Sequence, residues 1–472
     1  MEKDNSLDEI RSLLGWKRSI VWKEDNYNQI MSFADEYKQS LNNGKTERKF
    51  TKYSEEYLLR NGFIKFDNYL NNDRPINGLK LYKTIKDKGI IAFYGGRSLL
   101  SAGLNIVAAH IDSPRLDLKQ NPLFEDSGFS YLDTHYYGGI KVYQWLSMPL
   151  VMDGEIIKKD GSRVSINIGE SDSDPVFVIS DILPHLAREE KGSKVGDVFK
   201  AESLDIIVGS LPINYKEEEK DAIKLNILKI LNEKYGIIEE DFSSAEIEII
   251  PKGKAMDVGF DRSMILAYGQ DDRICAYPAL KAITEIDEQP ELSSLVLLLD
   301  KEEIGSEGNT GAKTKLIEEF LEDLISFSGE KITVNKLLSK SNCLSGDVSA
   351  AYDPHYKDVF EEKNSARLNK GIAINKYTGV AGKSGSSDAS AEFMGKIRNL
   401  FNTNSIKWQT AELGKVDVGG GGTVAKYFAE RGMEVIDCGP SILSMHAPYE
   451  ISSKADVYET YRAYLAFFKK FI

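Results

Sequence analysis

The segment of residues 293–320, SSLVLLLDKEEIGSEGNTGAKTKLIEEF, limits the possible folds of this chain more than any other segment. Its apolar run at 295–299 has the length of a strand and no alternation with polar residues, which favours a strand buried on both faces. The run ends in the charged sequence DKEE, which contains Glu302 and Glu303, and a helical pattern follows over residues 313–320. In an open α/β sheet, ligands bind just beyond the carboxyl ends of such strands.

The two adjacent glutamates can serve two different purposes. Because neighbouring side chains at a strand end point in opposite directions, one of Glu302 and Glu303 can bind a metal while the other faces a water or a substrate. An ordinary solvated acidic turn has the same local sequence. The choice between these interpretations depends on whether the rest of the chain supplies partner ligands.

Strands and helices alternate through most of the second half of the chain, which predicts a mostly parallel sheet with helices on both faces. Residues 1 to about 85 are predicted to be mainly helical, and two strand-like runs, GIIAFYGG and LNIVAAH, follow them. The final segment, SSKADVYETYRAYLAFFKKFI, is predicted to be an amphipathic helix with Ser452 or Ser453 as its N-cap.

Residues 116–245 have a different pattern, in which short segments of alternating apolar and polar residues are separated by Gly and Asp. The sequence KKDGSR between two apolar runs predicts a hairpin, and one helix is predicted over residues 217–235. At 472 residues the chain exceeds the usual size of a single core, so more than one domain is expected. We therefore expect a β-rich domain at 116–245 inserted into a catalytic domain made of residues 1–115 and 246–472.

The composition excludes several classes of protein. The chain is 42% hydrophobic and 28% charged, its apolar runs are too short for a membrane span, and its N-terminus lacks the core of a signal peptide. A net charge of −13 disfavours nucleic acid or an anionic membrane as a partner. Cys275, Cys343 and Cys438 are few and widely spaced, which argues against a cysteine zinc site and predicts a reducing, cytoplasmic location.

Several of the predicted strands end in a side chain that can bind a metal. A catalytic zinc takes about three protein ligands, and two ions roughly 3.5–4 Å apart usually share a bridging carboxylate. Five side chains therefore suffice for two ions. A single histidine with apolar neighbours is more often structural, but five candidates at successive strand ends indicate a metal centre. The candidates are His110, either Asp271 or Asp272, Glu303, Asp347 and His446.

The motifs around these candidates resemble those of a known family. AAHIDSP, GQDDR, DKEEIGS, SGDVSAAYDP and SMHAPYE, in this order and spacing, are similar to the motifs of the aspartyl aminopeptidase (aminopeptidase I) family of dinuclear zinc metallopeptidases. The resemblance covers nearly the whole chain. It implies a three-layer α/β/α zinc-peptidase catalytic domain with an inserted β-rich dimerisation domain.

The resemblance also implies a role for each matching residue. His110 and Asp347 would hold one zinc ion, Glu303 and His446 the other, and Asp271 would bridge the two; spacing alone leaves Asp272 equally possible as the bridge. Glu302 would be the general base. Asp112 would hydrogen-bond the ring of His110 and fix its tautomer. All of these roles are implied by the matching motifs.

Other features of the sequence concern the substrate. Lys383 in GKSGSSDAS falls at the position of the family's basic pocket residue, which implies a preference for acidic N-terminal residues, although the surrounding pattern departs from that of acidic-specific members. His185 in SDILPHLARE matches a Pro-His-Leu motif that reaches into a neighbouring subunit in this family, and an ordinary core histidine is the alternative. The loop 419–422 is expected to shape the site, and His135 and His355 are expected to be structural.

These observations predict a cytoplasmic aminopeptidase that removes single residues from peptides with a free N-terminus. The expected cofactors are two Zn2+ ions per chain, with Co2+ or Mn2+ as alternatives. The resemblance implies a homo-oligomer, a tetrahedral dodecamer built from dimers. The competing interpretations are a related dinuclear zinc carboxypeptidase or deacylase and a catalytically silent assembly protein.

Overall fold

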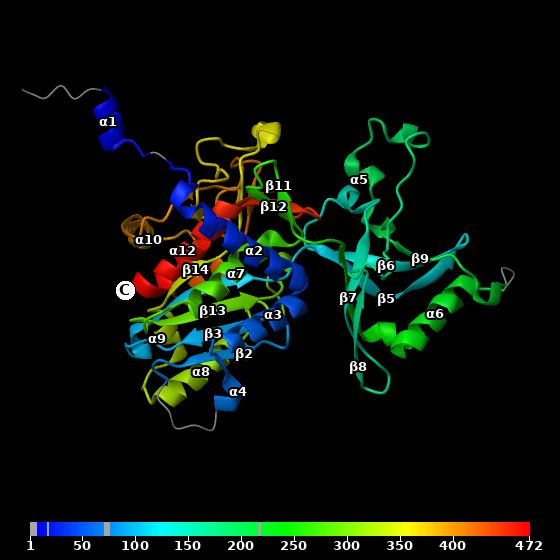
Figure 1. Cartoon of the computed structure of the whole chain (residues 1–472), viewed down its shortest axis with the longest axis horizontal. Coiled ribbons are helices and arrows are strands. Elements are labelled where there is room, and N and C mark those ends of the chain that lie inside the picture. Colours follow the sequence, from blue (N-terminus) through cyan, green and yellow to red (C-terminus); the bar gives the residue numbers. More distant parts are fainter. Residues whose placement is uncertain (1–6, 17, 70–75, 216–218) are drawn as a thin grey trace, which may run out of the picture.

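A nine-stranded sheet forms the centre of the larger of the two lobes in Figure 1. The computed structural model describes residues 7–16, 18–69, 76–215 and 219–472. The strands of this sheet, in spatial order, are β1 (Ile64–Lys65), β2 (Lys80–Thr84), β3 (Ile90–Tyr94), β13 (Ser293–Leu299), β4 (Leu104–His110), β14 (Asn342–Ser345), β20 (Glu434–Gly439), β16 (Ile372–Asn375) and β18 (Trp408–Thr410).

The four central strands β13, β4, β14 and β20 are parallel, so their carboxyl ends lie along one edge. On either side the direction changes, because β3 is antiparallel to β13 and β16 is antiparallel to β20. The sheet is thus mixed, and the predicted parallel arrangement holds for its centre. The chain has a mixed α/β fold.

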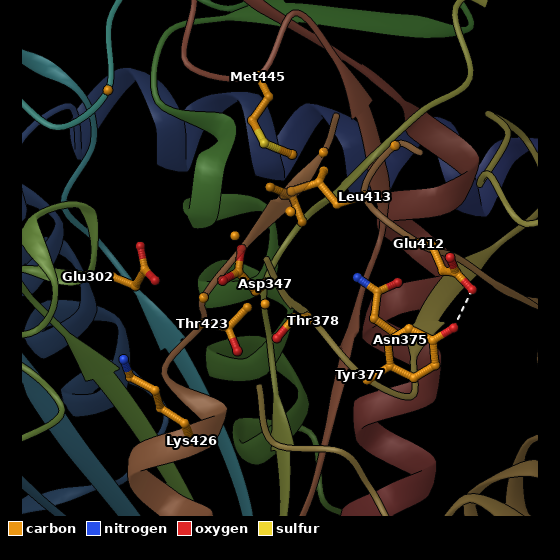
Figure 2. A pocket seen from close by; sticks show the side chains of 18 of the residues that line it. Glu302, Asp347, Asn375, Tyr377, Thr378, Glu412, Leu413, Thr423, Lys426 and Met445 are labelled. Carbon is orange, nitrogen blue, oxygen red and sulfur yellow. Dashed lines mark hydrogen bonds between the residues drawn. The ribbon is translucent and has the colours of Figure 1, made fainter. Parts of the chain in front are cut away.

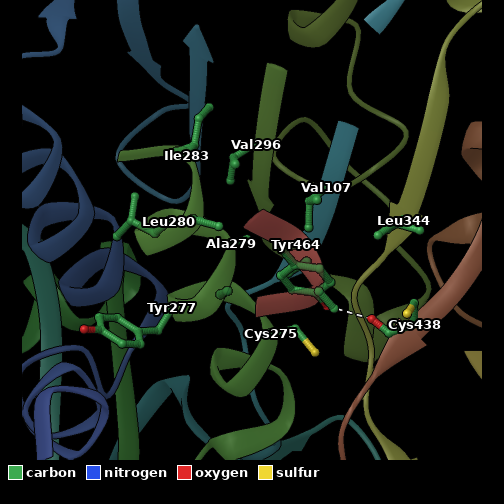
Figure 3. Packing of buried hydrophobic residues seen from close by; sticks show 14 of the residues in the cluster. Val107, Cys275, Tyr277, Ala279, Leu280, Ile283, Val296, Leu344, Cys438 and Tyr464 are labelled. Carbon is green, nitrogen blue, oxygen red and sulfur yellow. Dashed lines mark hydrogen bonds between the residues drawn. The ribbon is translucent and has the colours of Figure 1, made fainter. Parts of the chain in front are cut away.

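Helices pack on both faces of this sheet because its central strands are apolar on both sides. In β4, Val107 and Ala109 belong to one hydrophobic cluster, whereas Ile106 and Ala108 belong to another on the opposite face. Figure 3 shows part of the first cluster, in which the Tyr464 hydroxyl donates a hydrogen bond of 2.6 Å to a backbone carbonyl. The first cluster includes α2 (Tyr27–Asn43), α3 (Glu47–Arg60), α7 (Gln270–Thr284), α10 (Ala391–Thr403) and α12 (Lys454–Lys470), and the second includes α4 (Phe66–Tyr69), α8 (Leu316–Ser328), α9 (Val334–Leu338) and α11 (Ala425–Ala429).

The smaller lobe is built on an antiparallel six-stranded sheet with a hydrophobic core of its own, in which Trp145 is fully buried. The predicted hairpin KKDGSR joins β7 to β8. The sheet extends to Pro251, beyond the expected end of the insertion at 245, because β10 pairs along its whole length with β7. The strands, in spatial order, are β8 (Arg163–Ile168), β7 (Leu150–Ile157), β10 (Ala245–Pro251), β5 (Arg115–Asp126), β6 (Phe129–Tyr137) and β9 (Ile206–Gly209), and α5 (Val195–Val198) and α6 (Ala222–Tyr235) accompany them.

A third, five-stranded sheet lies at one end of the larger lobe. The chain passes from the nine-stranded sheet to this one at Gly439, between β20 and β21. Glycine is needed there because a Cβ atom would lie 2.1 Å from the carbonyl oxygen of Asp347. The strands, in spatial order, are β11 (Met256–Val258), β12 (Met264–Ala267), β22 (Glu450–Ser453), β21 (Ser441–Leu443) and β15 (Ser349–Ala350); β17 (Gly379–Val380) and β19 (Gly420–Gly421) form a separate pair.

Two terminal helices complete the larger lobe. Helix α12 is capped by Ser453, whose hydroxyl accepts the backbone N–H of Asp456 as predicted. Helix α1 (Leu7–Leu14) projects away from the lobe at the upper left of Figure 1. Among the described residues, we find no helix with the length and apolar character that a membrane span requires.

Candidate metal centre

Adjacent strands of the nine-stranded sheet carry three of the predicted ligand positions to one edge. His110 is the last residue of β4, Asp347 follows β14, and Glu302 and Glu303 lie in a short 3-10 turn, η8 (Glu302–Ile304), that follows β13. Because β13 and β14 are both parallel neighbours of β4, these carboxyl ends meet. Figure 2 shows Glu302 and Asp347 facing the same cavity.

Asp271 and His446 reach the same point from the five-stranded sheet. Strand β12 leads directly into α7, whose first turn holds Asp271, and His446 lies in the connection between β21 and β22. Each of the five candidates thus ends or follows a strand, but the strands belong to two different sheets. Two sheets converge on the centre, because β12, β22 and β21 are neighbours and their connections face the edge of the larger sheet.

The side chains form two groups that share Asp271. One group comprises His110, Asp271 and Asp347, the other Asp271, Glu303 and His446, and within each group one ligand atom per residue lies within 4.8 Å of the others. The Nε2 atoms of His110 and His446 lie 3.1 and 3.3 Å from the two carboxylate oxygens of Asp271. The Nε2 atom of His446 is also 3.5 Å from Glu303 Oε2. Two groups of possible metal ligands thus share one carboxylate, that of Asp271, and a third group joins His110 to Glu302 and Glu303.

The spacing of these atoms fits zinc. Ligand atoms that each lie about 2.0–2.2 Å from a tetrahedral ion are about 3.5 Å from one another. Moreover, Asp271 Oδ1 and Glu303 Oε1 are buried without a hydrogen-bond partner in the described part of the chain. Buried acceptors of this kind normally have a partner, so a cation is the group that these residues fit.

The structure distinguishes Asp271 from its neighbour Asp272. Asp271 lines the cavity and belongs to both groups of candidate ligands. The carboxylate of Asp272 is completely buried and lies outside both groups. The resemblance to the family points to Asp271, which faces the cavity, whereas the spacing in the sequence does not distinguish it from Asp272.

Several acids in the centre hold their protons more tightly than usual. Burial, together with the nearby charges of Asp112 and Asp271, raises the pKa of Glu302 to about 7. Burial and the charge of Asp271 raise the pKa of Glu303 well above its ordinary value, and burial and the charge of Glu302 do the same for the pKa of Asp347. Carboxylates crowded in this way favour a bound cation, which removes their mutual repulsion.

Glu302 and Glu303 both face the centre, so the expected opposition of their side chains is wrong. They belong to the 3-10 turn η8 rather than to the end of β13, because Lys301 before them adopts a left-handed conformation with φ of 68°. Both carboxylates approach the imidazole of His110. The Oε2 atom of Glu302 lies 4.0 Å from His110 Nε2.

Asp112 supports both the histidine and this turn. The Nδ1 atom of His110 lies 3.1 Å from the backbone carbonyl oxygen of Asp112 and 3.4 Å from its Oδ1 atom. The carboxylate accepts the backbone N–H groups of Glu302 and Glu303, each at 3.2 Å. The carboxylate of Asp112 thus positions the acidic turn, and its main chain makes the shorter contact with the ring.

Glu450, Tyr137 at the end of β6 and Gly139 just after it contribute further contacts to the centre. Glu450 is buried, and its two carboxylate oxygens accept the backbone N–H groups of Asp271 at 3.0 Å and His446 at 2.9 Å. Tyr137 donates to Asp112, and the carbonyl of Gly139 contacts His446. Glu450 lies in the quoted motif SMHAPYE, four residues after His446, but Asp271 and the partners of Tyr137 and Gly139 are distant in sequence, so no spacing pattern identifies these contacts.

The candidate ligands line one side of a cavity of about 500 Å³. The loop 419–422 forms part of its wall, as expected for a loop that shapes the site. Lys383 also lines the cavity, but its ammonium group lies 3.0 Å from Asp388 and 3.8 Å from the centre of the Tyr377 ring. Tyr377 in turn donates a hydrogen bond of 2.5 Å to Glu412, as Figure 2 shows.

The three other histidines lie outside this cavity. His185 is exposed on the smaller lobe and is not one of the described residues that line the cavity. His135 contacts the backbone carbonyl of the next residue, and the N–H of His355 is held by Asp353 at the start of a 3-10 turn. The side chains of His135 and His355 are exposed, so neither occupies a core position.

Comparisons with known proteins agree on one family. The family described as aminopeptidase I zinc metalloprotease (M18) matches residues 40–468. A probable M18 family aminopeptidase 1 of Clostridium acetobutylicum is 50% identical over 442 residues, which are 93% of this chain and 95% of that protein. The crystal structure of an M18 family aminopeptidase from Thermotoga maritima has a TM-score of 0.92 and 47% identity, and the match covers 96% of this chain and 100% of that one. A structure described as the S. cerevisiae mApe1 dodecamer has a TM-score of 0.75 at 22% identity and covers 94% of this chain and 98% of that one.

Proposed function

The chain belongs to the M18 family of aminopeptidase I zinc metalloproteases, and we propose that it removes single residues from peptide N-termini with two zinc ions and the Glu302 carboxylate as general base. As a member of this family it is a zinc-dependent aminopeptidase, a hydrolase. The observation that carries the two-ion proposal is the pair of ligand groups that share Asp271.

In this proposal His110 and Asp347 would hold one ion, Glu303 and His446 would hold the other, and Asp271 would be shared by both. The separation of its two oxygens supports this role, because each faces a different imidazole at 3.1 and 3.3 Å. When bound, two zinc ions lower the pKa of a shared water and polarise the scissile carbonyl. The buried carboxylates of Glu450 and Asp112 keep the ligand backbone and the acidic turn in place.

Glu302 is the proposed general base because it lies beside both ligand groups without being the shared carboxylate. Its side chain keeps 17% of its exposure and lies 4.0 Å from His110 Nε2, so a water beside the ligand groups is within its reach. Glu302 accepts a proton from the attacking water and passes it to the leaving amine. The turn η8 holds it at the edge of the cavity, where a water and a peptide bond can both be reached.

We also propose an assembly for the chain, in which the six-stranded sheet is a dimerisation domain inserted into a three-layer α/β/α catalytic domain. Exposed aromatic side chains on that lobe, Phe124 and Phe129 among them, support an interface, and a protein of the same fold is described as a dodecamer. The exposed position of His185 is compatible with the proposed reach into a neighbouring active site. The three buried, unpaired cysteines support a cytoplasmic location.

A substrate panel tests the proposed reaction. Metal-free protein is reloaded with Zn2+, Co2+ or Mn2+ and assayed with aminoacyl-p-nitroanilides and with the same compounds N-acetylated. We expect hydrolysis of the free-amino compounds only, and only in the reloaded samples. Hydrolysis of the N-acetylated compounds or of C-terminal peptide bonds would identify a deacylase or a carboxypeptidase, and inactivity of a fully loaded protein would identify an assembly protein.

A further inference from the structure

The end of strand β6 carries the six-stranded sheet into direct contact with the metal centre. Tyr137 is the last residue of β6, and Gly138 and Gly139 follow it. Figure 1 shows that this strand belongs to the smaller lobe, although the candidate ligands all belong to the larger one. Each residue of the segment 137–139 contacts a different part of the centre.

Tyr137 acts on the centre through Asp112. Its hydroxyl donates a hydrogen bond of 2.8 Å to Asp112 Oδ2, and both side chains are buried. The same carboxylate accepts the backbone N–H groups of Glu302 and Glu303. The guanidinium of Arg115, itself in β5, lies 3.9 Å from the centre of the Tyr137 ring and keeps the ring in place from the other side. The hydroxyl thus fixes the carboxylate that orients the acidic turn.

Gly138 and Gly139 contact the second ligand group. The carbonyl oxygen of Gly139 lies 2.9 Å from Nδ1 of His446. With this contact the imidazole presents Nε2 to Asp271 and Glu303. Gly138 lies so close to Glu303 that an added Cβ atom would be 3.2 Å from its carboxylate.

We propose that the segment 137–139 of the inserted sheet completes the metal centre, with Tyr137 as a positioning residue that acts through Asp112 and Gly139 as one that acts through His446. Both ion sites then depend on the docking of the smaller lobe against the larger one. The inference rests on the proposed function, because it concerns residues that hold the ligands of the two ions. It adds the requirement that the smaller lobe be docked before the two ligand groups can bind their ions tightly.

The test replaces the hydroxyl and keeps the ring. Tyr137→Phe preserves the packing against Arg115 but removes one of three hydrogen bonds to a buried carboxylate. Loss of a partner of this kind typically lowers metal affinity or activity about 10- to 100-fold. We expect zinc affinity, measured by competition with a chelator, to fall by such a factor, kcat to fall with it, and KM to change little. The visible absorption of the cobalt-loaded variant should also differ from that of the wild type.

Tyr136→Phe is the matched control. Tyr136 precedes Tyr137 in the same strand, its side chain is on the opposite face of the sheet, and it is 44% exposed. Its replacement should leave zinc affinity, the cobalt spectrum and kcat unchanged. If Tyr137→Phe also retains wild-type zinc affinity and the wild-type cobalt spectrum, the inference is overturned.

A second variant tests the other half of the segment. Gly139 does not have a positive φ angle, so alanine is conformationally permitted, but its Cβ atom would lie 3.3 Å from Nδ1 of His446. We expect Gly139→Ala to lose one of the two ions, the one held by the group of His446, and to keep the other. Gly196→Ala, at a position of the smaller lobe with no atom within 4 Å of the added carbon, should keep both.

The outcomes separate this inference from the proposed function. Failure of the wild-type protein to bind two ions would contradict the proposed two-ion centre itself. Two ions in the wild type and two equally tight ions in both Tyr137→Phe and Gly139→Ala would leave that centre intact and overturn the role of the segment. Circular dichroism of the metal-free variants identifies any that are misfolded, because only those lose the secondary structure of the wild type.

Discussion

At the scale of single residues, the two neighbouring glutamates of the centre differ in how deeply their side chains are buried. Glu303 is almost completely buried and belongs to the group of His446, whereas Glu302 retains 17% of its side-chain exposure and lies beside His110. The more enclosed residue is suited to bind an ion, and the more accessible one is suited to exchange protons with a water. Their backbone N–H groups share one acceptor, Asp112.

Substitutions of the two glutamates should therefore have different effects. Glu302→Gln should retain two zinc ions per chain and lose turnover by about 3 kcal/mol or more of barrier, the contribution of a positioned base. Glu303→Gln should lose zinc. Elemental analysis and steady-state kinetics measure both effects, and Glu307→Gln, an exposed acid in the following loop, serves as the control. Zinc loss in Glu302→Gln with full occupancy in Glu303→Gln would refute the assignment.

The sequence alone identified the candidate ligands better than it identified their supports. His110, Glu303 and Asp347 could be found because apolar runs end beside them at the edge of one sheet. Tyr137 and Glu450 could not, because Tyr137 acts across two sheets on Asp112 and Glu450 acts on the backbone of Asp271, which is far from it in sequence. The choice of Asp271 over Asp272 required the resemblance to a known family, since only the backbone of the first turn of α7 decides which carboxylate faces the cavity.

At the scale of elements, the loops around β17 and β19 form the wall of the cavity opposite the ligands. Asp388 lies between two cations, 2.9 Å from the ammonium group of Lys376 and 3.0 Å from that of Lys383. Of these two, Lys383 lines the cavity. The ammonium group of Lys383 therefore interacts with Asp388 and is also available to a substrate side chain in the cavity.

If Lys383 contacts the substrate, the protein should prefer acidic N-terminal residues, and Lys383→Ala should reduce that preference. A charged hydrogen bond contributes about 1.5–3 kcal/mol, which corresponds to roughly ten- to a hundredfold in kcat/KM. Because Lys383 is exposed, we expect the change in kcat/KM to be near the lower end of this range. Lys376→Ala should leave the preference unchanged. Assays with Asp, Glu, Leu and Lys anilides measure it, and a wild-type preference for Leu or Lys would show that another residue selects the substrate.

The order of the elements was more predictable than their membership of sheets. The strands at 90–94 and 104–110 and the final helix lie where periodicity and capping place them. The five-stranded sheet was not predicted, because its strands are short and come from segments as distant as β11 and β22. Strands of two to four residues carry too little periodicity to be assigned to a sheet.

At the scale of the whole molecule, stability and metal loading should be coupled through pH. Burial raises the pKa of Glu302 to about 7 and that of Glu450 to about 8. Near pH 6 the folded, metal-free protein therefore binds protons that the unfolded chain has released. The contribution of these groups to stability is present below the unfolded pKa and is lost as the pH rises through the folded pKa, so the metal-free protein should become less stable from about pH 5 to about pH 8.

Zinc binding displaces these protons and should reverse the trend. The difference in Tm between zinc-loaded and metal-free protein should widen over the same interval of pH. Thermal unfolding of both forms in a series of buffers measures it. A constant difference, or a metal-free form that gains stability with pH, would contradict the prediction.

Assembly gives a further prediction at this scale. His185→Ala and Glu302→Gln subunits should each be nearly inactive, but mixed assemblies should regain activity if His185 acts in a neighbouring subunit. With random pairing across a two-fold interface, roughly one site in four would combine an intact base with an intact neighbouring histidine. Mixtures with His135→Ala provide the control, because that exposed histidine of the same lobe should not affect activity at all. Proven mixed assembly without recovered activity would exclude the role in trans.

The convergence of three sheets on one point has a consequence for the life of the protein in the cell. The first candidate ligand in the sequence is residue 110 and the last is residue 446. The contacts that hold these side chains in place come from all three sheets. A chain still emerging from the ribosome, a proteolytic fragment or a partly folded intermediate therefore lacks a working centre. Peptide hydrolysis is therefore expected only from a chain in which residues 110 to 446 have all been synthesised and folded together.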